Sequence, residues 1–293
     1  MRIWLNAARP RTLPAAIAPV LVGTAAAMEA VGDLPRVGGF LAALVASILI
    51  QIGTNLANDY SDARRGADSA DRLGPVRVTS AGLVTPRRVL IATWLAFGLS
   101  LLLGLYLAFL AGWIIIVVGV LSIAAGVLYT GGPKPYGYAG LGEVFVFLFF
   151  GLVAVNGSYY VQLEKLAFLP LGLSISIGFL ATAILVVNNV RDMDTDKRAG
   201  KITLAVRIGR SAARRLYVGL VGGAFVVIVA TVVIEGDVWW ALLGLLAIPL
   251  ARKPITAVTQ HTDGPALNGA LAGTGAVLGI FALLTTIGLV ISS

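Results

Sequence analysis

Long uncharged apolar runs constrain this chain more than any other feature of its sequence. A helix needs roughly 20 apolar residues to cross the roughly 30 Å hydrocarbon layer of a membrane. Runs of about this length without a charged side chain cover residues 12–28, 37–58, 89–133, 144–163, 166–190, 216–234, 238–251 and 264–293. The third run is long enough for two spans that turn near Gly112, and the seventh run is the shortest. We therefore expect an all-α polytopic membrane protein, a bundle of nine transmembrane helices.

The basic residues give the expected orientation of this bundle, because cytoplasmic loops carry most of the Lys and Arg of a membrane protein. With a cytoplasmic N-terminus, 20 of the 22 Lys and Arg fall in cytoplasmic segments, and only Arg36 and Lys165 fall outside. Without a crossing at residues 238–251, Arg252 and Lys253 would also move outside, which favours nine spans. The first run is longer than the roughly 7 to 15 apolar residues of a signal-peptide core, so we expect it to remain as a span.

The residue types present limit the chemistry that the chain can perform. It contains no Cys and one His, His261, which excludes disulfides, thiolate metal sites and sites with several His ligands. Only 12% of the residues are charged and the mean hydropathy is +0.92, unlike a soluble domain. The positions of the charges matter more than the net charge of +8, and we expect no nucleic-acid partner. Any chemistry must use carboxylates, amides, hydroxyls, Lys and Arg.

Two polar segments with similar side chains follow the second and the sixth expected spans. Within each segment these residues are three or four positions apart, as are residues on one face of a helix. They are Asn55, Asn58, Asp59 and Asp62 in the first segment, and Asn188, Asp192 and Asp196 in the second. The spans are four apart, so both segments lie at the same membrane face. We expect a parallel repeat within one domain, residues 1–293, with cytoplasmic Asp-rich loops near residues 55–88 and 188–215.

The oxygen-bearing side chains of these segments predict a metal site. Carboxylate and amide oxygens are hard ligands, and Mg²⁺ is typically bound by one or two carboxylates together with substrate phosphates. The predicted metal ligands are Asn58, Asp59, Asp62, Asp192 and Asp196. Two such stripes that face each other would form a site for a metal-bridged diphosphate. The alternative is a pair of solvated helix ends, although acids at a helix C-terminus interact unfavourably with the macrodipole.

Basic and aromatic side chains near these segments are candidate substrate contacts. Lys and Arg can pair with phosphate oxygens, Arg in bidentate fashion, although the positive-inside rule alone explains most of these residues. The candidates for substrate binding are Asn55, Arg65, Arg72, Arg77, Arg191, Lys201 and Glu143. The candidates for catalysis are Asp62, Asp192, Asp196, Tyr129 and Lys134. Interface anchoring is an equal alternative for Tyr129 and Lys134, and Glu143 is alternatively a charge at a helix N-terminus.

These two segments resemble the metal-diphosphate motifs of the UbiA superfamily of intramembrane aromatic prenyltransferases. The pattern is Asn-Asp-x-x-Asp at residues 58–62 and Asp-x-x-x-Asp at residues 192–196. Many members continue the first motif with a further acid where this chain has Gly66, and Asp68 could replace that acid from the loop. One branch, the 1,4-dihydroxy-2-naphthoate polyprenyltransferases of menaquinone synthesis, is similar at residues 9–14, 55–62, 71–75, 129–133, 140–143 and 188–209.

The resemblance implies a Mg²⁺-dependent transferase that uses a polyprenyl diphosphate and 1,4-dihydroxy-2-naphthoate, with loss of CO₂ and diphosphate. It further implies a multi-pass protein of the inner (cytoplasmic) membrane whose active site opens to the cytoplasm. An acceptor such as 4-hydroxybenzoate is one alternative, and an ion-coupled transporter is another. The transporter is disfavoured because the acids lie at one membrane face, whereas coupling sites lie near the midplane. The sequence indicates neither the prenyl length nor the oligomeric state.

Overall fold

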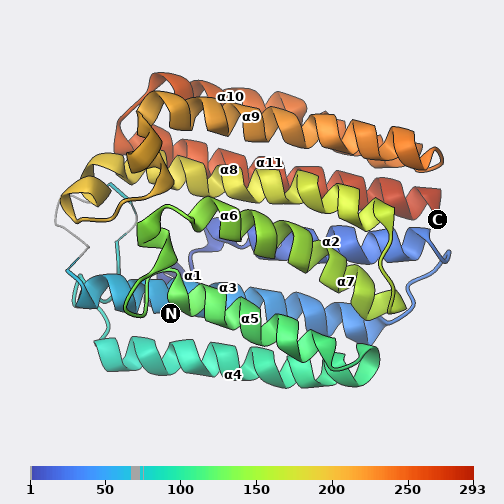
Figure 1. The fold of residues 1–293 in the computed structure, drawn as a ribbon, viewed down its shortest axis with the longest axis horizontal. Helices are drawn as coiled ribbons and strands as arrows, with labels where there is room; N and C mark the ends of the chain where they lie inside the picture. Colours follow the sequence, from blue (N-terminus) through green and yellow to red (C-terminus); the bar gives the residue numbers. More distant parts are fainter. Residues whose placement is uncertain (1, 67–72, 75) are drawn as a thin grey trace.

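The computed structural model describes residues 2–66, 73–74 and 76–293. Its helices are α1 (Arg2–Ala8), η1 (Pro10–Thr12), α2 (Pro14–Glu29), α3 (Val37–Arg64), α4 (Pro86–Ala111), α5 (Ile114–Leu128), η2 (Tyr136–Ala139), α6 (Gly142–Val146), the π-helical η3 (Phe147–Val153), α7 (Ala154–Leu163), α8 (Phe168–Arg198), α9 (Leu204–Glu235), η4 (Trp239–Ala247), α10 (Ile248–Gln260) and α11 (Gly264–Ser292). The long helices lie side by side along one axis (Figure 1). The prediction of an all-α membrane bundle is confirmed.

Seven helical segments are long and apolar enough to cross a membrane, counted over the described residues. An eighth span results if the segment Ile3–Thr12 and the helix α2, which are bent by 50° relative to each other, are taken together. Helix α5 is apolar but has only 15 residues. Each of the nine expected spans corresponds to one of these elements, but only seven reach spanning length on their own.

The segment after Val238 differs from the sequence prediction. The 3₁₀ segment η4 leads directly into α10, and together they form a helical segment of 22 residues, from Trp239 to Gln260. The exposed Arg252 and Lys253 lie within this segment, whereas they ended the apolar run in the sequence. The long side chains of Lys and Arg can reach a polar boundary while their backbone continues as a helix, so a charge pair need not end a span.

Helix α8 is the most enclosed of the long helices. In its most apolar stretch 78% of the residues are buried, compared with 28% in α4. It packs against α9, η3 and α11, and Leu173, Ile177 and Leu180 are completely buried. A helix that is surrounded by protein is apolar on all sides. Because α8 runs through the interior of the bundle, its polar C-terminal turns also lie inside the bundle.

The segment that packs against α8 contains a π-helical stretch, η3. Gly151 of η3 meets α8 without a side chain, since a Cβ on Gly151 would lie 2.6 Å from the Cα of Gly178. The two backbones therefore touch at this point. Short π-helical stretches occur frequently at functional sites, and Phe149 and Phe150 of η3 line the cavity described below.

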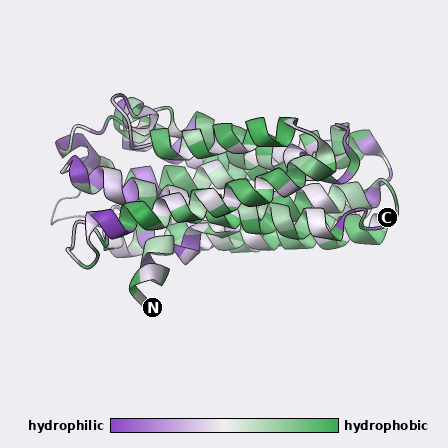
Figure 2. Ribbon diagram, turned by 90° about the horizontal axis from the view of Figure 1, so that it is seen from below, coloured by the Kyte–Doolittle hydropathy of each residue, from purple (hydrophilic) through white to green (hydrophobic). Residues whose placement is uncertain are grey.

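Polar residues gather near the ends of the bundle (Figure 2), and α3 and α8 both end at the left in Figure 1. The two Asp segments therefore lie at one end. At the other end, Arg36 Nη1 donates to the backbone oxygens of Leu110, at 2.8 Å, and Val161, at 3.0 Å. These carbonyls belong to the last turns of α4 and α7, where oxygens lack intrahelical donors. Arg36 thus satisfies the carbonyls of two helix ends, which explains why a basic residue lies at the end of the bundle opposite to most other Lys and Arg.

Candidate active site

A cavity of about 250 Å³ lies inside the bundle where α3 and α8 end. Its apolar walls come from α2, α3, α5, η3 and α8, and include Ala16, Ile50, Ala125, Phe149 and Ile184. Its polar lining consists mainly of Arg9, Asn55, Asn58, Asp62, Arg77, Asn188, Asp192, Asp196 and Lys201. Binding sites commonly combine apolar walls with a few convergent polar groups. This distribution suits an amphipathic molecule with an anionic head.

Three of the four residues expected on one face of α3 line this cavity: Asn55, Asn58 and Asp62. The hydroxyl of Thr130 donates to Asn58 Oδ1 at 2.9 Å, and Asn55 Nδ2 donates to Thr12 Oγ1 at 3.2 Å. These contacts come from the loop after α5 and from η1. The amide oxygen of Asn58 is thereby oriented by a neighbouring element rather than by its own helix.

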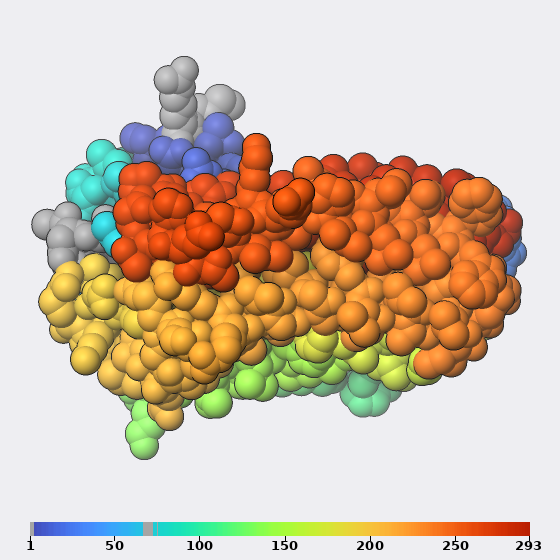
Figure 3. Space-filling model, turned by 90° about the horizontal axis from the view of Figure 1, so that it is seen from above, coloured from blue at the N-terminus to red at the C-terminus, as the bar shows by residue number. Residues whose placement is uncertain are grey.

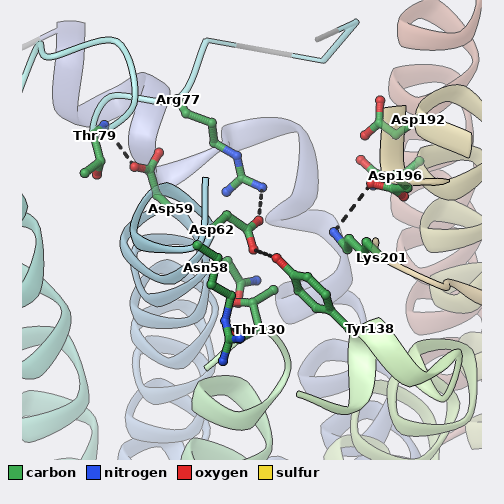
Figure 4. Close-up of polar contacts among 12 residues, drawn as sticks. Asn58, Asp59, Asp62, Arg77, Thr79, Thr130, Tyr138, Asp192, Asp196 and Lys201 are labelled. Carbon is green, nitrogen blue, oxygen red and sulfur yellow. Dashed lines mark hydrogen bonds and ion pairs between the residues drawn. The ribbon is translucent and has the colours of Figure 1, made fainter. Parts of the chain in front are cut away.

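Asp62 is held between a cation and a phenol. Arg77 Nη2 donates to Asp62 Oδ2 at 2.9 Å, and the Tyr138 hydroxyl donates to Asp62 Oδ1 at 2.9 Å (Figure 4). The Tyr138 ring also lies 5.4 Å from Lys201 Nζ and 5.7 Å from Arg65 Cζ. Cations within about 6 Å of an aromatic ring are attracted by its quadrupole. Tyr138 therefore connects Asp62 to two cations from different parts of the chain.

Asp59, the fourth residue of the expected stripe, is directed away from the other acids (Figure 4). Its Oδ2 accepts from the backbone N–H of Val78 at 3.1 Å, and its Oδ1 accepts from the backbone N–H of Thr79 at 2.9 Å. The residue is 2% exposed and does not line the cavity. Both carboxylate oxygens are used to hold the loop before α4. In this geometry Asp59 positions the loop that carries Arg77.

The second Asp segment is held largely by its own helix. Arg191 Nη2 and Nε donate to the two carboxylate oxygens of Asp192, at 2.6 Å and 2.7 Å. The same guanidinium donates to the side-chain oxygens of Asn188, at 2.8 Å, and Asn268, at 2.9 Å. Asn268 of α11 in turn donates to the backbone oxygen of Leu73 at 2.9 Å. Arg191 is 2% exposed and does not line the cavity, so it acts on Asp192.

Asp196 lies one helical turn beyond Asp192. Its Oδ1 is 3.9 Å from Lys201 Nζ, and the backbone N–H of Lys201 donates to the Asp196 backbone oxygen at 2.8 Å. Lys201 thus folds back over the end of α8. Both residues line the cavity, with Lys201 between Asp196 and the Tyr138 ring (Figure 4).

The donor set fits a hard divalent cation that binds together with a ligand. Across residues 2–66, 73–74 and 76–293, no three acids or histidines come close enough to form a preformed metal cage. The cavity is nevertheless lined by Asn58 and Asp62 from the first Asp segment and by Asp192 and Asp196 from the second. Mg²⁺ usually binds through one or two carboxylates and substrate phosphates rather than in an all-protein cage. These oxygens are of the right type, and the basic side chains beside them suit an anionic co-ligand.

Three other predicted residues, Arg65, Lys134 and Glu143, do not line the cavity. Arg65 Nε donates to the Thr130 backbone oxygen at 3.1 Å, and Lys134 is exposed. Glu143 is 6% exposed and accepts from Asn189 Nδ2 at 2.9 Å. Arg72, like Asp68, lies outside the described residues.

Tyr129 lines the cavity at one end of an aromatic row. Tyr136 packs edge-on against Tyr129, with ring centroids 5.5 Å apart, and stacks on Phe145 at 4.0 Å. Phe149 continues the row, 6.1 Å from Phe145. Burial, followed by the nearby Glu143 charge, raises the pKa of Tyr129 well above its usual value. The Tyr129 phenol therefore stays protonated and can donate a hydrogen bond, but it is not suited to act as a base.

The structure also adds residues that the sequence patterns did not identify as site residues. Four of these line the cavity, one orients Asp62 and one holds Arg191; they are Arg9, Thr12, Gln51, Thr130, Tyr138 and Asn268. Arg9 precedes η1 and has a left-handed backbone with φ of 53°, and Thr12 is the last residue of η1. The signal for this bend was Pro10 and Pro14, since proline begins helices and interrupts them. Tyr138 contacts Asp62, and Asn268 contacts Arg191, through tertiary contacts that no spacing pattern encodes.

A bundle of apolar helices around such a cavity defines a polytopic membrane protein suited to an amphipathic, anionic substrate. The chain belongs to the UbiA prenyltransferase family, whose family model matches residues 16–266. The resemblance found in the sequence is thus confirmed.

Curated relatives cover nearly the whole chain. A Mycobacterium tuberculosis protein named 1,4-dihydroxy-2-naphthoate octaprenyltransferase is 45% identical, over 96% of this chain and 94% of the relative. An Escherichia coli protein of the same name is 40% identical, over 94% of this chain and 91% of the relative.

Solved structures share the fold at low sequence identity. A UbiA homologue from Archaeoglobus fulgidus, bound to GPP and Mg²⁺, matches with a TM-score of 0.72 at 14% identity, covering 98% of this chain and 99% of the other. The apo structure of a homologue from Aeropyrum pernix matches with a TM-score of 0.68 at 14% identity, covering 99% and 98%. The fold of this chain is therefore that of the UbiA homologues.

Proposed function

We propose that the protein transfers a polyprenyl group from an allylic polyprenyl diphosphate to 1,4-dihydroxy-2-naphthoate. The allylic C–O bond breaks, a carbon–carbon bond forms between the prenyl group and the ring, and the ring carboxylate leaves as CO₂. The other products are diphosphate and demethylmenaquinol, so the reaction belongs to menaquinone biosynthesis. The names of the mycobacterial and enterobacterial relatives, at 45% and 40% identity, support this acceptor.

The observation that carries the proposal is a single cavity that joins both Asp segments to an apolar, aromatic wall. The polar end matches a diphosphate, and the apolar walls match an isoprenoid. The two halves of the donor substrate thus find complementary surroundings in one continuous space. A purely polar or purely apolar cavity would match only one of these halves.

Arg77 and Lys201 are the residues that we assign to the diphosphate. Both line the cavity, and both already neutralise a carboxylate: Arg77 contacts Asp62 and Lys201 contacts Asp196. Phosphate oxygens placed between the two segments would share these cations with the acids. Arg pairs with phosphate through two parallel hydrogen bonds, and Lys acts as a point charge.

We assign Asn58, Asp62, Asp192 and Asp196 to a Mg²⁺ site. When bound, Mg²⁺ supplies a Lewis acid that takes up negative charge on the departing diphosphate. The archaeal homologue solved with GPP and Mg²⁺ supports the choice of metal. Asp59 is left out of this set, because its two oxygens are used by the backbone amides of the loop.

The aromatic row beginning at Tyr129 is where we place the naphthoate ring. Aromatic side chains pack against a flat ring through offset or edge-to-face contacts. The protonated Tyr129 hydroxyl can hold a ring oxygen of the acceptor by donating a hydrogen bond. Tyr136, Phe145 and Phe149 also keep water away from the electron-poor allylic carbon. Water would otherwise react with this carbon in place of the acceptor ring.

The proposal includes a topology. The whole chain, residues 1–293, forms one transmembrane domain with nine crossings, in which α2 and the short α5 count as spans. The N-terminus and the active site face the cytoplasm, and the protein resides in the inner membrane of a bacterial cell. The concentration of Lys and Arg at the Asp-rich end supports this orientation.

Product analysis by mass spectrometry tests the proposal. Purified protein in nanodiscs is given 1,4-dihydroxy-2-naphthoate, a polyprenyl diphosphate and Mg²⁺, with a parallel reaction in EDTA. We expect a metal-dependent prenylated naphthoquinol that is lighter by CO₂ than the simple adduct. Product with 4-hydroxybenzoate alone would replace the acceptor, and no product with either acceptor in folded protein would contradict prenyl transfer.

A further inference from the structure

A second basic site lies on the outside of the bundle, between the start of α9 and the end of α10. We call it the arginine groove; it is lined by Arg210, Ser211, Arg214, Arg215, Val218 and Thr259. Figure 3 looks onto the face that α9 and α10 form side by side. The groove shares no lining residue with the central cavity.

The helix geometry of α9 directs its basic side chains into this groove. Gly209 interrupts the helix with φ of 79°, and a regular helical segment begins after it. Arg210 and Arg214 are one turn apart, and Val218 follows one turn further along the same face. Thr259, in the last turn of α10, forms the opposite wall.

The guanidinium groups of the groove are incompletely neutralised. Arg210 pairs with Asp194, whose side chain is 74% exposed, at 2.9 Å. In the described part of the chain, neither Arg214 nor Arg215 forms an ion pair with a carboxylate. Arg215 Nη1 donates to Ser211 Oγ at 2.9 Å. The groove therefore keeps positive charge that its own surroundings do not balance.

Arg214 supplies a more specific indication of a ligand. Its Nη2 donates to the backbone oxygen of His261 at 2.6 Å, which fixes the guanidinium at the α10–α11 loop. Its Nε is buried and has no hydrogen-bond partner among the described residues. A buried donor without an acceptor is costly, so the protein alone does not fully satisfy this guanidinium. Arg pairs with phosphate oxygens in the bidentate geometry that a held guanidinium presents.

The surroundings of the groove point to a lipid as the source of this anion. The groove lies at the polar ends of two helical segments that are long enough to span the membrane. Val218 belongs to its lining and is 38% exposed, and the outward-facing Val226 further along α9 is 68% exposed. A phospholipid could place its headgroup among the arginines and its acyl chains along this apolar surface. A free phosphate would use only the first part of the site.

We propose that the arginine groove binds the headgroup of an anionic phospholipid from the surrounding bilayer. The phosphate lies between Arg214 and Arg215, the Ser211 hydroxyl can donate to the rest of the headgroup, and the acyl chains follow α9. Arg210 also donates to the Val190 backbone oxygen of α8 at 2.9 Å, which links the groove to the helix that carries the second Asp segment.

Native mass spectrometry of the full-length protein tests this site with short-chain phosphatidylglycerol as the probe. Short-chain phosphatidylcholine and inorganic phosphate serve as comparison ligands. The test variant is R214Q/R215Q, and the matched control is R87Q/R88Q, which removes the same charge from two exposed arginines at the start of α4. We expect phosphatidylglycerol to bind wild type and the control at least about tenfold more tightly than the test variant.

The other outcomes overturn the proposal. An equal loss of binding in both double variants would mean that charge alone attracts the lipid. Inorganic phosphate binding as tightly as the lipid, or phosphatidylcholine binding as tightly as phosphatidylglycerol, would mean that the site does not recognise an anionic lipid. If R214Q/R215Q does not fold, Thr259→Asp keeps the arginines and places a competing carboxylate in the groove. Undiminished phosphatidylglycerol binding to folded Thr259→Asp would also refute the site.

Discussion

The two Asp segments contain the same residue types but are held in different ways. At the end of α3, Asp59 and Asp62 are held by a loop: Asp59 accepts from two of its backbone amides, and Asp62 pairs with Arg77 from the same loop. At the end of α8, Asp192 forms a hydrogen-bonded ion pair with its neighbour Arg191, and Asp196 lies close to Lys201. The first segment depends on tertiary structure, whereas the second is almost self-contained. Residues with similar spacing therefore have different roles: Asp62, Asp192 and Asp196 line the cavity, whereas Asp59 holds the loop beside it.

The largest expected effect separates cavity acids from other acids. Asp62→Asn and Asp192→Asn should each lower kcat/KM by more than about 1000-fold, or about 4 kcal/mol, because each removes charge from the proposed metal site. Asp194→Asn is the matched control, since Asp194 lies on α8 but is exposed and outside the cavity. Turnover assays with expression checked by size exclusion measure the difference. Near-normal turnover in either test variant would remove that residue from the site.

Arg191→Met should be the most destabilising substitution in the second segment. The guanidinium is almost fully buried and pairs with a buried carboxylate, so its removal leaves Asp192 unpaired. Breaking one partner of such a pair costs about 3–5 kcal/mol. Thermal unfolding in detergent should show a large decrease in Tm relative to Lys253→Met, which changes an exposed residue of α10. Equal Tm values for the two variants would contradict this role.

Asp59→Asn tests whether the first segment really contains a structural acid. The change leaves one carbonyl oxygen for two backbone donors, and an unsatisfied buried donor costs about 1–3 kcal/mol. We expect a lower Tm, while the Mg²⁺ concentration that gives half-maximal turnover stays as in wild type. A shift of that Mg²⁺ concentration, like the one expected for Asp62→Asn, would place Asp59 among the metal ligands.

Tyr138→Phe removes the hydrogen bond that the phenol donates to Asp62 while keeping the ring beside Lys201. Because a hydrogen bond to a charged group is involved, we expect turnover to fall by about tenfold. The KM for polyprenyl diphosphate should increase together with this loss. Unchanged kinetics would show that Arg77 alone is sufficient to orient Asp62.

The smallest expected effect concerns Tyr129. Burial raises the pKa of Tyr129 well above its usual value, so the phenol stays protonated across the pH range in which the enzyme is assayed. Tyr129→Phe should therefore lower the rate by about threefold at every pH between about 6 and about 9, by loss of one neutral hydrogen bond. The shape of the pH–rate profile should not change. Loss of an alkaline or acidic limb in the variant would instead identify Tyr129 as a titrating group.

The sequence predicted the helical membrane bundle because apolar runs and the distribution of basic residues are local signals. Helical spacing likewise predicted that Asn55, Asn58 and Asp62 share a face, and all three line one cavity. The same spacing included Asp59, whose orientation depends on a loop twenty residues away in the chain. Arg191 was expected to contact substrate, but the structure places it on Asp192, since a buried carboxylate next to it required a partner.

Other features needed three-dimensional contacts to become visible. Tyr138 and Asn268 carry no spacing signal, yet they orient Asp62 and Arg191. The segment around η4 and α10 appeared short because Arg252 and Lys253 interrupt its apolar run, although the helix continues to Gln260. The family relationship, in contrast, was recognisable from the two Asp motifs alone and is confirmed by the family match over residues 16–266.

The most direct test of the central claim is the Mg²⁺ dependence of donor binding. A prenyl thiodiphosphate that resists cleavage is titrated into wild type, Asp62→Asn, Asp192→Asn and Asp194→Asn, with Mg²⁺ and with EDTA. If both segments hold one metal-bridged diphosphate, wild type and Asp194→Asn bind the analogue only with Mg²⁺, and the other two variants lose this binding. Mg²⁺-dependent binding of wild-type strength in Asp62→Asn and Asp192→Asn would contradict the shared site.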